Sequence, residues 1–420
     1  MRLIEPIAER SVAPVSRRRE FALTAVLSLN FGFVFFDRNA LNYLMPFVSK
    51  DLNLGSGQIG LLAGATALSW ALSGLIFGRL SDRFGRPRSI LVLATIGFSL
   101  MSVVSGFAAS FIALLAIRLL MGCAEGPVLP VSQSVIAAEA APERRGMLMG
   151  IMNNFGSNLL GVLIAPPLLI TIAHLFGWRA GFWLAGLPGL ITAAAIYFVV
   201  RDNGPVTDRQ DTIPAHGTTD WRLILQSRNV VLCMGIACCM LAWTLLGWAF
   251  LPIYFTTVSG FSPDKMAVLM SVLGGSAVVS SIIVPGLSDR FGRKPVLIIF
   301  TLLGVIPALA IAGLSSNAAG LGALLFVGWM ASGSLPIFMA TIPSESISKA
   351  QLATTMALVM GVGEVIGGAL MPVVAGFLAD RYGMAIILVL QASCAVTAAI
   401  LGAFIIETAP RAVRRTQLKV

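Results

Sequence analysis

The hexapeptide Ser-Asp-Arg-Phe-Gly-Arg occurs twice, at Ser81–Arg86 and at Ser288–Arg293, and the copies are 207 residues apart in a chain of 420 residues. Each copy lies between two long apolar stretches, although only 11% of the residues are charged. An identical charged repeat in such a chain indicates two related halves. Because the flanking stretches are long enough to cross a bilayer, this layout is typical of a secondary transporter whose site lies between its halves.

The composition predicts an all-α integral membrane protein. Hydrophobic residues make up 57% of the chain and the mean hydropathy is +0.89, whereas soluble domains contain roughly 45–50% apolar residues. The apolar residues form runs of about 20, the length of a membrane-spanning helix. Twelve transmembrane helices are predicted, six in each of two pseudo-symmetric halves, near residues 21–46, 57–80, 88–107, 109–137, 146–172, 178–200, 229–257, 266–287, 295–314, 318–342, 352–378 and 383–406.

The net charge of +10 follows the predicted topology. If both termini are cytoplasmic, the cytoplasmic segments hold 23 of the 29 Lys and Arg residues, and the segments on the other side hold four. This asymmetry is the positive-inside rule, so the basic charge predicts a multi-pass orientation in a bacterial inner membrane. A nucleic-acid partner is not expected, because the sequence has no aromatic residues interleaved with basic ones as in a stacking surface.

The longest polar stretch, residues 201–228, is predicted to be a cytoplasmic linker between the halves. The rest of the chain then divides into a cytoplasmic N-terminal tail (1–20), an N-terminal half (21–200), a C-terminal half (229–406) and a cytoplasmic C-terminal tail (407–420). Most other loops are short, so consecutive helices should be antiparallel neighbours. The sequence shows no phosphate-binding loop, nucleophile–base constellation or metal-binding spacing of Cys and His. We therefore expect no enzyme activity, no cofactor and no metal, and a chain that forms its pathway as a monomer.

Each copy of the repeat is predicted to form a cytoplasmic loop in which glycine permits a tight reversal and aspartate pairs with a basic side chain or a helix N-terminus. The pattern resembles the conserved cytoplasmic loop of the major facilitator superfamily, with departures at Pro87 and Pro285, and a fainter copy lies at residues 376–383. Length, spans and paired motifs extend the resemblance over essentially the whole chain. The resemblance implies that the repeated loops act as a conformational latch, formed by Asp82, Arg83, Arg86, Asp289, Arg290 and Arg293. The alternative is that these residues only anchor the topology.

Ionisable residues also fall inside the predicted spans, at Asp37, Arg38, Arg118, Glu125 and Glu364. An isolated charge at the bilayer centre is costly, so each needs a partner or a watery cavity, and a functional role is the default hypothesis. Arg118 and Glu125 are seven residues apart on one span, which places them on the same face, roughly 10 Å apart along the helix axis. A purely structural ion pair is the alternative.

These charges extend the family resemblance. The Arg-x3-Gly-x3-Gly run from Arg118 to Gly126 is similar to a motif of the same superfamily, a span-four arginine implicated in proton coupling. Together with Asp37 and Arg38 on the first span, it resembles the anion:cation symporter branch, which includes bacterial importers of sugar acids and other organic acids. The resemblance implies that Arg38 binds the substrate carboxylate. It also implies that Asp37 and Glu125 carry protons and that Arg118 changes partner between them.

The chemistry agrees with these roles. A guanidinium stays charged and can bind a carboxylate through two hydrogen bonds. Burial favours the neutral form of a carboxyl group, so such a group can load a proton on one side of the membrane and release it on the other. Glu364, in a glycine-rich stretch, is predicted as a further proton-coupling site, or else as a partner of a neighbouring polar group.

Several amide and aromatic side chains in the spans could contact a ligand between the halves. Aromatic residues in membrane helices also serve as packing or interfacial residues, which is the alternative here. Aromatic lining would favour a planar carboxylate and amide lining a sugar acid, and the sequence contains both. The predicted substrate-binding residues, in addition to Arg38, are Tyr43, Trp70, Gln133, Asn154, Asn158, Trp243 and Trp248.

These observations predict a proton-coupled symporter that imports an organic carboxylate by alternating access, with the small organic anion, protons and the lipid bilayer as its partners. One alternative is a proton-driven efflux antiporter of the same fold. Drug antiporters of the superfamily usually carry a Gly-Pro-Gly-Gly-type run in span five, and residues 156–161 do not match it. A remote alternative is a ligand sensor that does not transport, which would need a cytoplasmic partner domain or long tail.

Overall fold

The computed structural model describes residues 17–84, 86–141, 144, 148–202, 221–313, 318–347 and 351–409, with side chains at all of these except 78–84, 154–155, 221–223, 318 and 353. The described chain is helical, and twelve helical segments are long and apolar enough to cross a membrane. The prediction of twelve transmembrane helices is therefore confirmed. Several helices are longer than predicted, because they continue past the apolar run into polar residues.

In the N-terminal half, two helices begin with residues that favour helix N-termini. Pro87 occupies the first position of α3, and the Ser110 side chain accepts a hydrogen bond from the Ala113 backbone at the start of α4 (3.2 Å), as expected at helix N-termini. The elements are α1 Arg17–Asp51, α2 Ser56–Phe84, α3 Pro87–Ser105, α4 Phe111–Glu125, α5 Val128–Glu139, η1 Ile151–Phe155, α7 Gly156–Asn158, η2 Leu159–Ile164, α8 Ala165–Phe176 and α9 Trp178–Val199.

A short helix, α10 Trp221–Gln226, precedes the C-terminal half. In that half, Ser262 caps a helix that begins with Pro263. The elements are α11 Arg228–Thr257, α12 Pro263–Phe291, α13 Arg293–Leu303, α14 Ile306–Gly313, α15 Ala318–Trp329, η3 Met330–Ser334, η4 Ile337–Thr341, α16 Ile342–Ser346, α17 Leu352–Gly363, η6 Glu364–Leu370, α18 Met371–Tyr382 and α19 Ala385–Ala403.

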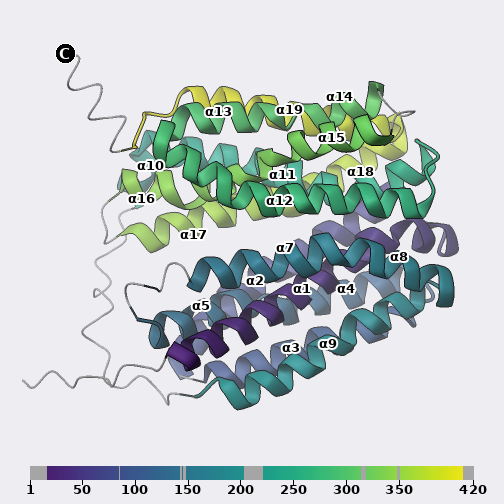
Figure 1. Cartoon of the computed structure of the whole chain (residues 1–420), viewed down its shortest axis with the longest axis horizontal. Coiled ribbons are helices and arrows are strands. Elements are labelled where there is room, and N and C mark those ends of the chain that lie inside the picture. The colour runs from purple at the N-terminus through teal and green to yellow at the C-terminus, as the bar shows by residue number, and fades with distance from the viewer. Residues whose placement is uncertain are drawn as a thin grey trace, which may run out of the picture.

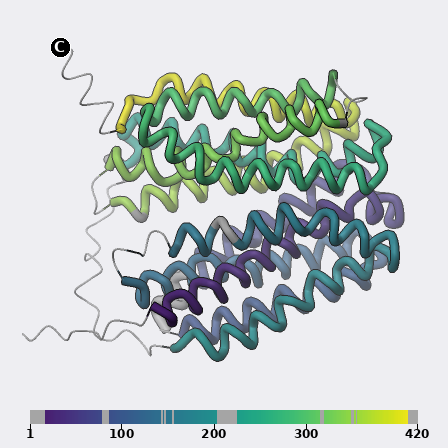
Figure 2. The backbone as a smooth tube through the Cα atoms, viewed as in Figure 1, coloured from purple at the N-terminus to yellow at the C-terminus, as the bar shows by residue number. Residues whose placement is uncertain are grey.

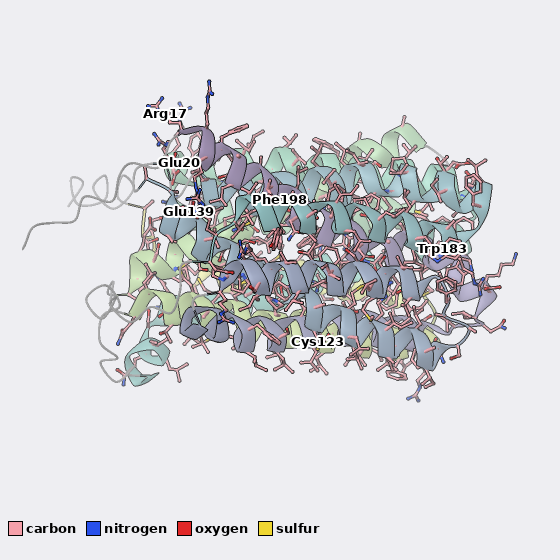
Figure 3. All side chains as sticks on the ribbon, turned by 90° about the horizontal axis from the view of Figure 1, so that it is seen from below. Arg17, Glu20, Cys123, Glu139, Trp183 and Phe198 are labelled. Carbon is pink, nitrogen blue, oxygen red and sulfur yellow. The ribbon has the colours of Figure 1, made fainter. Side chains whose placement is uncertain are left out.

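The helices form two bundles that lie side by side with their helices running in roughly the same direction (Figures 1 and 2). The N-terminal half forms one bundle and the C-terminal half the other. At one end of the molecule, which we call the linker end, α1 begins, α9 ends and α19 ends (Figure 1). We call the opposite end, where α1 ends and α2 begins, the far end. Arg17, Glu20 and Glu139 lie at the linker end and Trp183 toward the far end (Figure 3).

Ion pairs tie the start of α1 to the loop after α5 at the linker end. The Arg144 guanidinium donates to the Glu20 carboxylate at 2.7 Å, and the Arg19 Nε donates to Glu139 at 2.8 Å. The Glu20 side chain is buried and also accepts from the Ala141 backbone N–H at 3.0 Å. These contacts stay within the N-terminal half, so they fix the position of α1 in its own bundle.

Several spans that the sequence predicts as continuous helices are interrupted in the structure. The fourth span breaks between α4 and α5 at Gly126–Pro127, where proline lacks the N–H that would continue the helix. The fifth, tenth and eleventh spans contain π-helical segments, in which each backbone hydrogen bond spans five residues and not four, and which are frequent at functional sites. These irregularities were not predicted from the sequence.

The fifth and eleventh spans share a second repeat that the hexapeptide does not reveal. A π-helical segment, η2 or η6, is followed in each span by a proline in the first turn of an α-helix, α8 or α18. Each of these helices ends at a glycine with positive φ, +83° in one and +85° in the other. The repeat has a spacing of 206 residues and relates Gly161 to Gly367, Pro166 to Pro372 and Gly177 to Gly383.

The two halves contact each other through several helix pairs, among them α1 with α11, α2 with η6 and α18, and η2 and α8 with α12. The Asp380 carboxylate of α18 accepts hydrogen bonds from the backbone N–H groups of Ser56 and Gly57 at the start of α2, at 2.7 and 2.8 Å. His174 of α8 lies 3.5 Å from Asp264 of α12. A β-carbon on Gly60 or Gly64 of α2 would overlap backbone carbonyls that close η6 and open α18. These contacts hold the bundles together at the end opposite the linker.

Candidate functional site

Arg38 lies at the centre of the candidate site, on α1. Its guanidinium carbon is 5.3 Å from the centre of the Trp70 ring on α2, within the range of a cation–π interaction. Among the described residues, Arg38 makes no ion pair or hydrogen bond with a carboxylate. The Trp70 indole N–H is buried and has no hydrogen-bond partner there either. Two hydrogen-bond donors, one of them charged, are therefore available at this point.

Glu125 ends α4 and is completely buried. Neither of its carboxylate oxygens has a hydrogen-bond partner among the described residues. α4 can approach α2 closely because a β-carbon on Gly122 would overlap Ser69 and one on Gly126 would lie 2.7 Å from the Gly74 backbone nitrogen. The two glycines thus let α2 pack closely against α4. The positive charges of Arg38 and Arg118 both act on Glu125.

Asp37 is fully buried on the other side of α1. The Ser102 hydroxyl of α3 lies 2.5 Å from one Asp37 oxygen and 2.9 Å from the Phe182 carbonyl of α9. The second Asp37 oxygen has no partner among the described residues. Asp37 therefore faces the interior of its own bundle, whereas its sequence neighbour Arg38 points toward α2, as expected for adjacent residues that lie about 100° apart on a helix.

Arg118 lies between the two buried carboxyl groups. Its guanidinium donates to the Ser105 hydroxyl at 3.3 Å, lies 3.0 Å from the Met121 sulfur and stands 5.0 Å from the centre of the Phe182 ring. It makes no ion pair among the described residues, although the charges of Asp37 and Glu125 act on it. In this structure it is therefore held by neutral groups, with both carboxylates near enough to attract it.

Glu364 is the ionisable side chain that the C-terminal half contributes to the candidate site. It begins η6, and one of its oxygens is buried without a partner and packs against Gly368 one turn later. The positive charge of Arg38 acts on Glu364 across the boundary between the halves. α2, which carries Trp70, packs against the same π-helical segment. The charge of Arg38 therefore acts on a carboxyl group in each half, Glu125 in its own half and Glu364 in the other.

The predicted polar contacts on the fifth span are partly used for packing. The buried Tyr43 hydroxyl donates to the Gly161 carbonyl at 3.2 Å, and Gln133 donates to Asn153 at 3.4 Å. Asn158, half-buried, immediately precedes η2 and has no hydrogen bond from its side chain among the described residues. The Asn154 side chain lies outside the described part of the structure.

The predicted tryptophans of α11 belong to an aromatic cluster in the C-terminal half. Trp243 is completely buried and its N–H donates to the Gly304 carbonyl at 2.8 Å, at the end of α13. Its ring centre lies 4.4 Å from that of Trp329, which lies 5.0 Å from that of Trp248. Trp248 is only half-buried, so of the two predicted residues it is the one with surface available to a ligand.

The second copy of the repeated hexapeptide links four segments of the C-terminal half. Gly292 has φ of +110°, which suits glycine and produces the predicted reversal between α12 and α13. Arg293 is buried, bonds to Asp289 and donates to Glu345 at 2.9 Å. Its backbone N–H donates to Glu407 at 2.8 Å. These partners lie in the same half, so in this structure the network braces one bundle.

The remaining members of the repeat are more exposed or undescribed. Arg290 is exposed and its guanidinium carbon lies 5.4 Å from the centre of the Phe291 ring. Arg86 is exposed and directly precedes α3. The side chains of Asp82 and Arg83 lie outside the described part of the structure. Among the described residues, no group of three or more His, Cys, Asp or Glu side chains is placed to hold a metal ion.

Several residues that complete the site were not predicted from the sequence. Ser102 and Ser105 bond to Asp37 and Arg118, and Phe182 contributes both a carbonyl and a ring. Serine recurs at one-turn spacing through α3, so a polar stripe on an apolar helix was a detectable signal. Trp329 gave no such signal, because the sequence does not show whether a buried tryptophan packs against other aromatic rings or against aliphatic side chains.

The comparison with known proteins agrees with this architecture. A family model described as Major Facilitator Superfamily matches residues 27–362 and 232–419. The chain is 24% identical over 383 residues to a probable sulfoacetate transporter of Cupriavidus necator, covering 86% of this chain and 87% of that protein. It is 27% identical over 305 residues to a probable L-galactonate transporter of Escherichia coli, covering 67% and 65%. It is 24% identical over 357 residues to a 4-hydroxybenzoate transporter of Pseudomonas aeruginosa, covering 78% and 79%.

The fold also matches solved structures. The crystal structure of a bacterial homolog of the human lysosomal transporter Spinster, in an inward-facing and unoccupied conformation, superposes with a TM-score of 0.75 at 19% identity. The match covers 92% of this chain and 98% of that one. At this identity the likeness establishes the arrangement of the helices.

Proposed function

The chain belongs to the Major Facilitator Superfamily and is a multi-pass membrane transporter, not an enzyme, and from that premise we propose that it imports an organic carboxylate together with protons. The observation that carries the proposal is the unpaired guanidinium of Arg38 at the interface of the halves. Its ring partner Trp70 adds a second free donor. A carboxylate is the complementary ligand, because it can accept hydrogen bonds from a guanidinium through both oxygens.

The relatives support the chemical class. Their names specify sulfoacetate, L-galactonate and 4-hydroxybenzoate, all small organic acids. This variety also explains why the substrate is proposed as a class, with an aromatic acid and a sugar acid as the two specific candidates. Both would present a carboxylate to Arg38.

The proposed coupling uses the two buried carboxyl groups of the N-terminal half. Glu125 has no hydrogen-bond partner at either oxygen, and Asp37 has one free oxygen. Arg118 lies between them and is held only by neutral groups. Protonation of one carboxyl group removes its negative charge, so the other carboxyl group then attracts Arg118 more strongly. The position of this guanidinium in the bundle would therefore depend on which carboxyl group is protonated.

The proposed orientation bears on the conformational state of the structure. The basic residues of the chain concentrate in the segments at the linker end, which we propose to be cytoplasmic in a bacterial inner membrane. The Asp380 cap and the His174–Asp264 contact, which join the halves, lie at the far end. This arrangement supports an inward-facing state, from which the halves rock about the central site to open the other side.

Uptake into proteoliposomes containing the purified full chain tests the proposal. Labelled D-gluconate and 4-hydroxybenzoate are supplied with and without an imposed inward proton gradient, and protein-free liposomes measure passive entry of the acids. We expect at least one acid to accumulate only when the gradient is present and the protein is in the membrane. Gradient-driven movement of hydrophobic cations, with no movement of either acid, would instead identify an efflux antiporter.

A further inference from the structure

The central site contains unpaired hydrogen-bonding groups of both kinds. The free donors are the Arg38 guanidinium and the Trp70 N–H. The free acceptors are both oxygens of Glu125 and one oxygen of Glu364. Buried polar groups are normally paired, so a ligand that fills such a site has to supply acceptors at one end and donors at the other.

A simple carboxylate satisfies only half of this requirement. Its oxygens can accept from Arg38 and Trp70, but it offers no hydrogen to Glu364, and a second anionic group there would meet a like charge. A hydroxyl group on the same ligand would donate to the free oxygen of Glu364. Because Glu364 comes from the opposite half, such a ligand would also join the two halves.

The repeat in the fifth and eleventh spans gives Glu364 a counterpart. Asn158 lies three residues before Gly161, and Glu364 lies three residues before Gly367. Each stands at the start of a π-helical segment, η2 in the first case and η6 in the second. The two halves therefore present equivalent positions with different chemistry, since an amide both donates and accepts, whereas a carboxylate only accepts.

We infer that Glu364 is a specificity-determining residue that accepts a hydrogen bond from a substrate hydroxyl while Arg38 binds the carboxylate, so that the transported acids are hydroxycarboxylates. The inference rests on the proposed function, in which Arg38 is the carboxylate receptor. It gives Glu364 a role in selecting the substrate in place of the proton-coupling role predicted from the sequence. A site built to bond a hydroxyl rejects an analogue without it more strongly than an apolar pocket rejects an extra group.

The test compares matched acids with and without hydroxyl groups. Affinities of the purified full chain are measured by titration calorimetry for 4-hydroxybenzoate against benzoate and for D-gluconate against hexanoate. We expect the wild type to prefer the hydroxylated member of at least one pair, and Glu364→Met to reduce that preference roughly 10- to 100-fold, as for the loss of a hydrogen bond to a charged group. Val365→Ala, an exposed neighbour on η6, is the matched control and should keep the preference.

A second variant and readout separate selection from proton coupling and from folding. Glu364→Gln keeps the shape of the side chain, and we expect it to accumulate D-gluconate in response to a proton gradient, with weaker affinity. Loss of gradient-driven accumulation at saturating substrate in this variant would overturn the inference in favour of coupling. An unchanged preference in Glu364→Met would also overturn it. A wild type that binds none of the four acids would overturn the proposed function itself.

Discussion

Asp380 in the C-terminal half caps a helix of the N-terminal half: its carboxylate accepts the backbone N–H of Ser56, the first residue of α2, at 2.7 Å. A carboxylate at this position neutralises an otherwise unpaired donor and interacts favourably with the helix dipole. Caps of this kind stabilise a helix by about 1 kcal/mol. Here the stabilisation exists only while the halves are closed at the far end, so the cap favours one conformational state of the transporter.

Replacing Asp380 by Asn should therefore shift the conformational equilibrium toward opening of the far end. Asparagine keeps one acceptor but loses the negative charge and the second hydrogen bond, so the loss is about 1 kcal/mol and the ratio of the two states changes roughly fivefold. Spin labels at Lys50 and Val258, which are exposed at the far end in opposite halves, would measure the distance distribution between the halves. Asp51→Asn is the matched control, because Asp51 bonds to Arg179 within its own half. Identical distributions in both variants and the wild type would exclude a conformational role for Asp380.

Replacing Arg38 by Gln should weaken carboxylate binding by about 3 kcal/mol, roughly a hundredfold, because a charged, two-pronged hydrogen-bond donor is removed. The expected defect is in substrate affinity, which calorimetry measures directly. Arg179→Gln removes a cation at the far end that already pairs with Asp51, and should leave affinity unchanged. Equal affinities of Arg38→Gln and wild type would remove Arg38 from the binding site.

Replacing Glu125 by Gln should separate substrate movement from proton movement. The amide keeps the volume of the buried side chain but cannot take up a proton, so counterflow exchange of substrate should continue while accumulation falls to the equilibrium level. Both quantities are measured in the same proteoliposomes, with and without an imposed gradient. Full accumulation by this variant would show that Glu125 is not the coupling residue.

Replacing Gly122 by Ala should destabilise the N-terminal half by about 1–3 kcal/mol, the usual range for an overpacked core. The new methyl group would overlap Ser69 and lie 2.6 Å from the Thr66 carbonyl oxygen. Thermal unfolding in detergent measures the effect as a lowered midpoint temperature. Gly286→Ala, with open space around the added carbon, should not lower the midpoint. A Gly122→Ala protein as stable as the wild type would mean that α2 and α4 can move apart without loss.

The sequence was sufficient to predict the twelve spans, because uninterrupted apolar runs determine which segments enter the bilayer. It was not sufficient to predict the break at Gly126–Pro127 or the π-helical segments. Membrane helices tolerate glycine and proline in regular geometry as well, so these residues alone do not locate a distortion. The shared spacing of Gly161 and Pro166 with Gly367 and Pro372 was visible in the sequence and would have pointed to the irregular part of both spans.

The site was predictable to the extent that charge is rare in a membrane. Arg38, Glu125 and Glu364 stand out in any apolar run, and in the structure the charge of Arg38 acts on both carboxyl groups. Their neutral partners were not predictable, since the contact between Asp37 and Ser102 depends on the rotation of α1 against α3. Whether an aromatic residue packs in the core or faces the site was not predictable either, because this also depends on how the helices are rotated against each other. Trp243 is completely buried and supports α13, whereas Trp248 keeps exposed surface, and no local pattern distinguishes them.

Part of the far-end contact between the halves is made by peptide backbone. A side chain on Gly60 or Gly64 would overlap the carbonyls of Pro372 and Ala369, and the Val373 side chain packs beside Gly64. Opening this end would therefore break the Asp380 cap and expose both side chains and closely packed backbone groups to water.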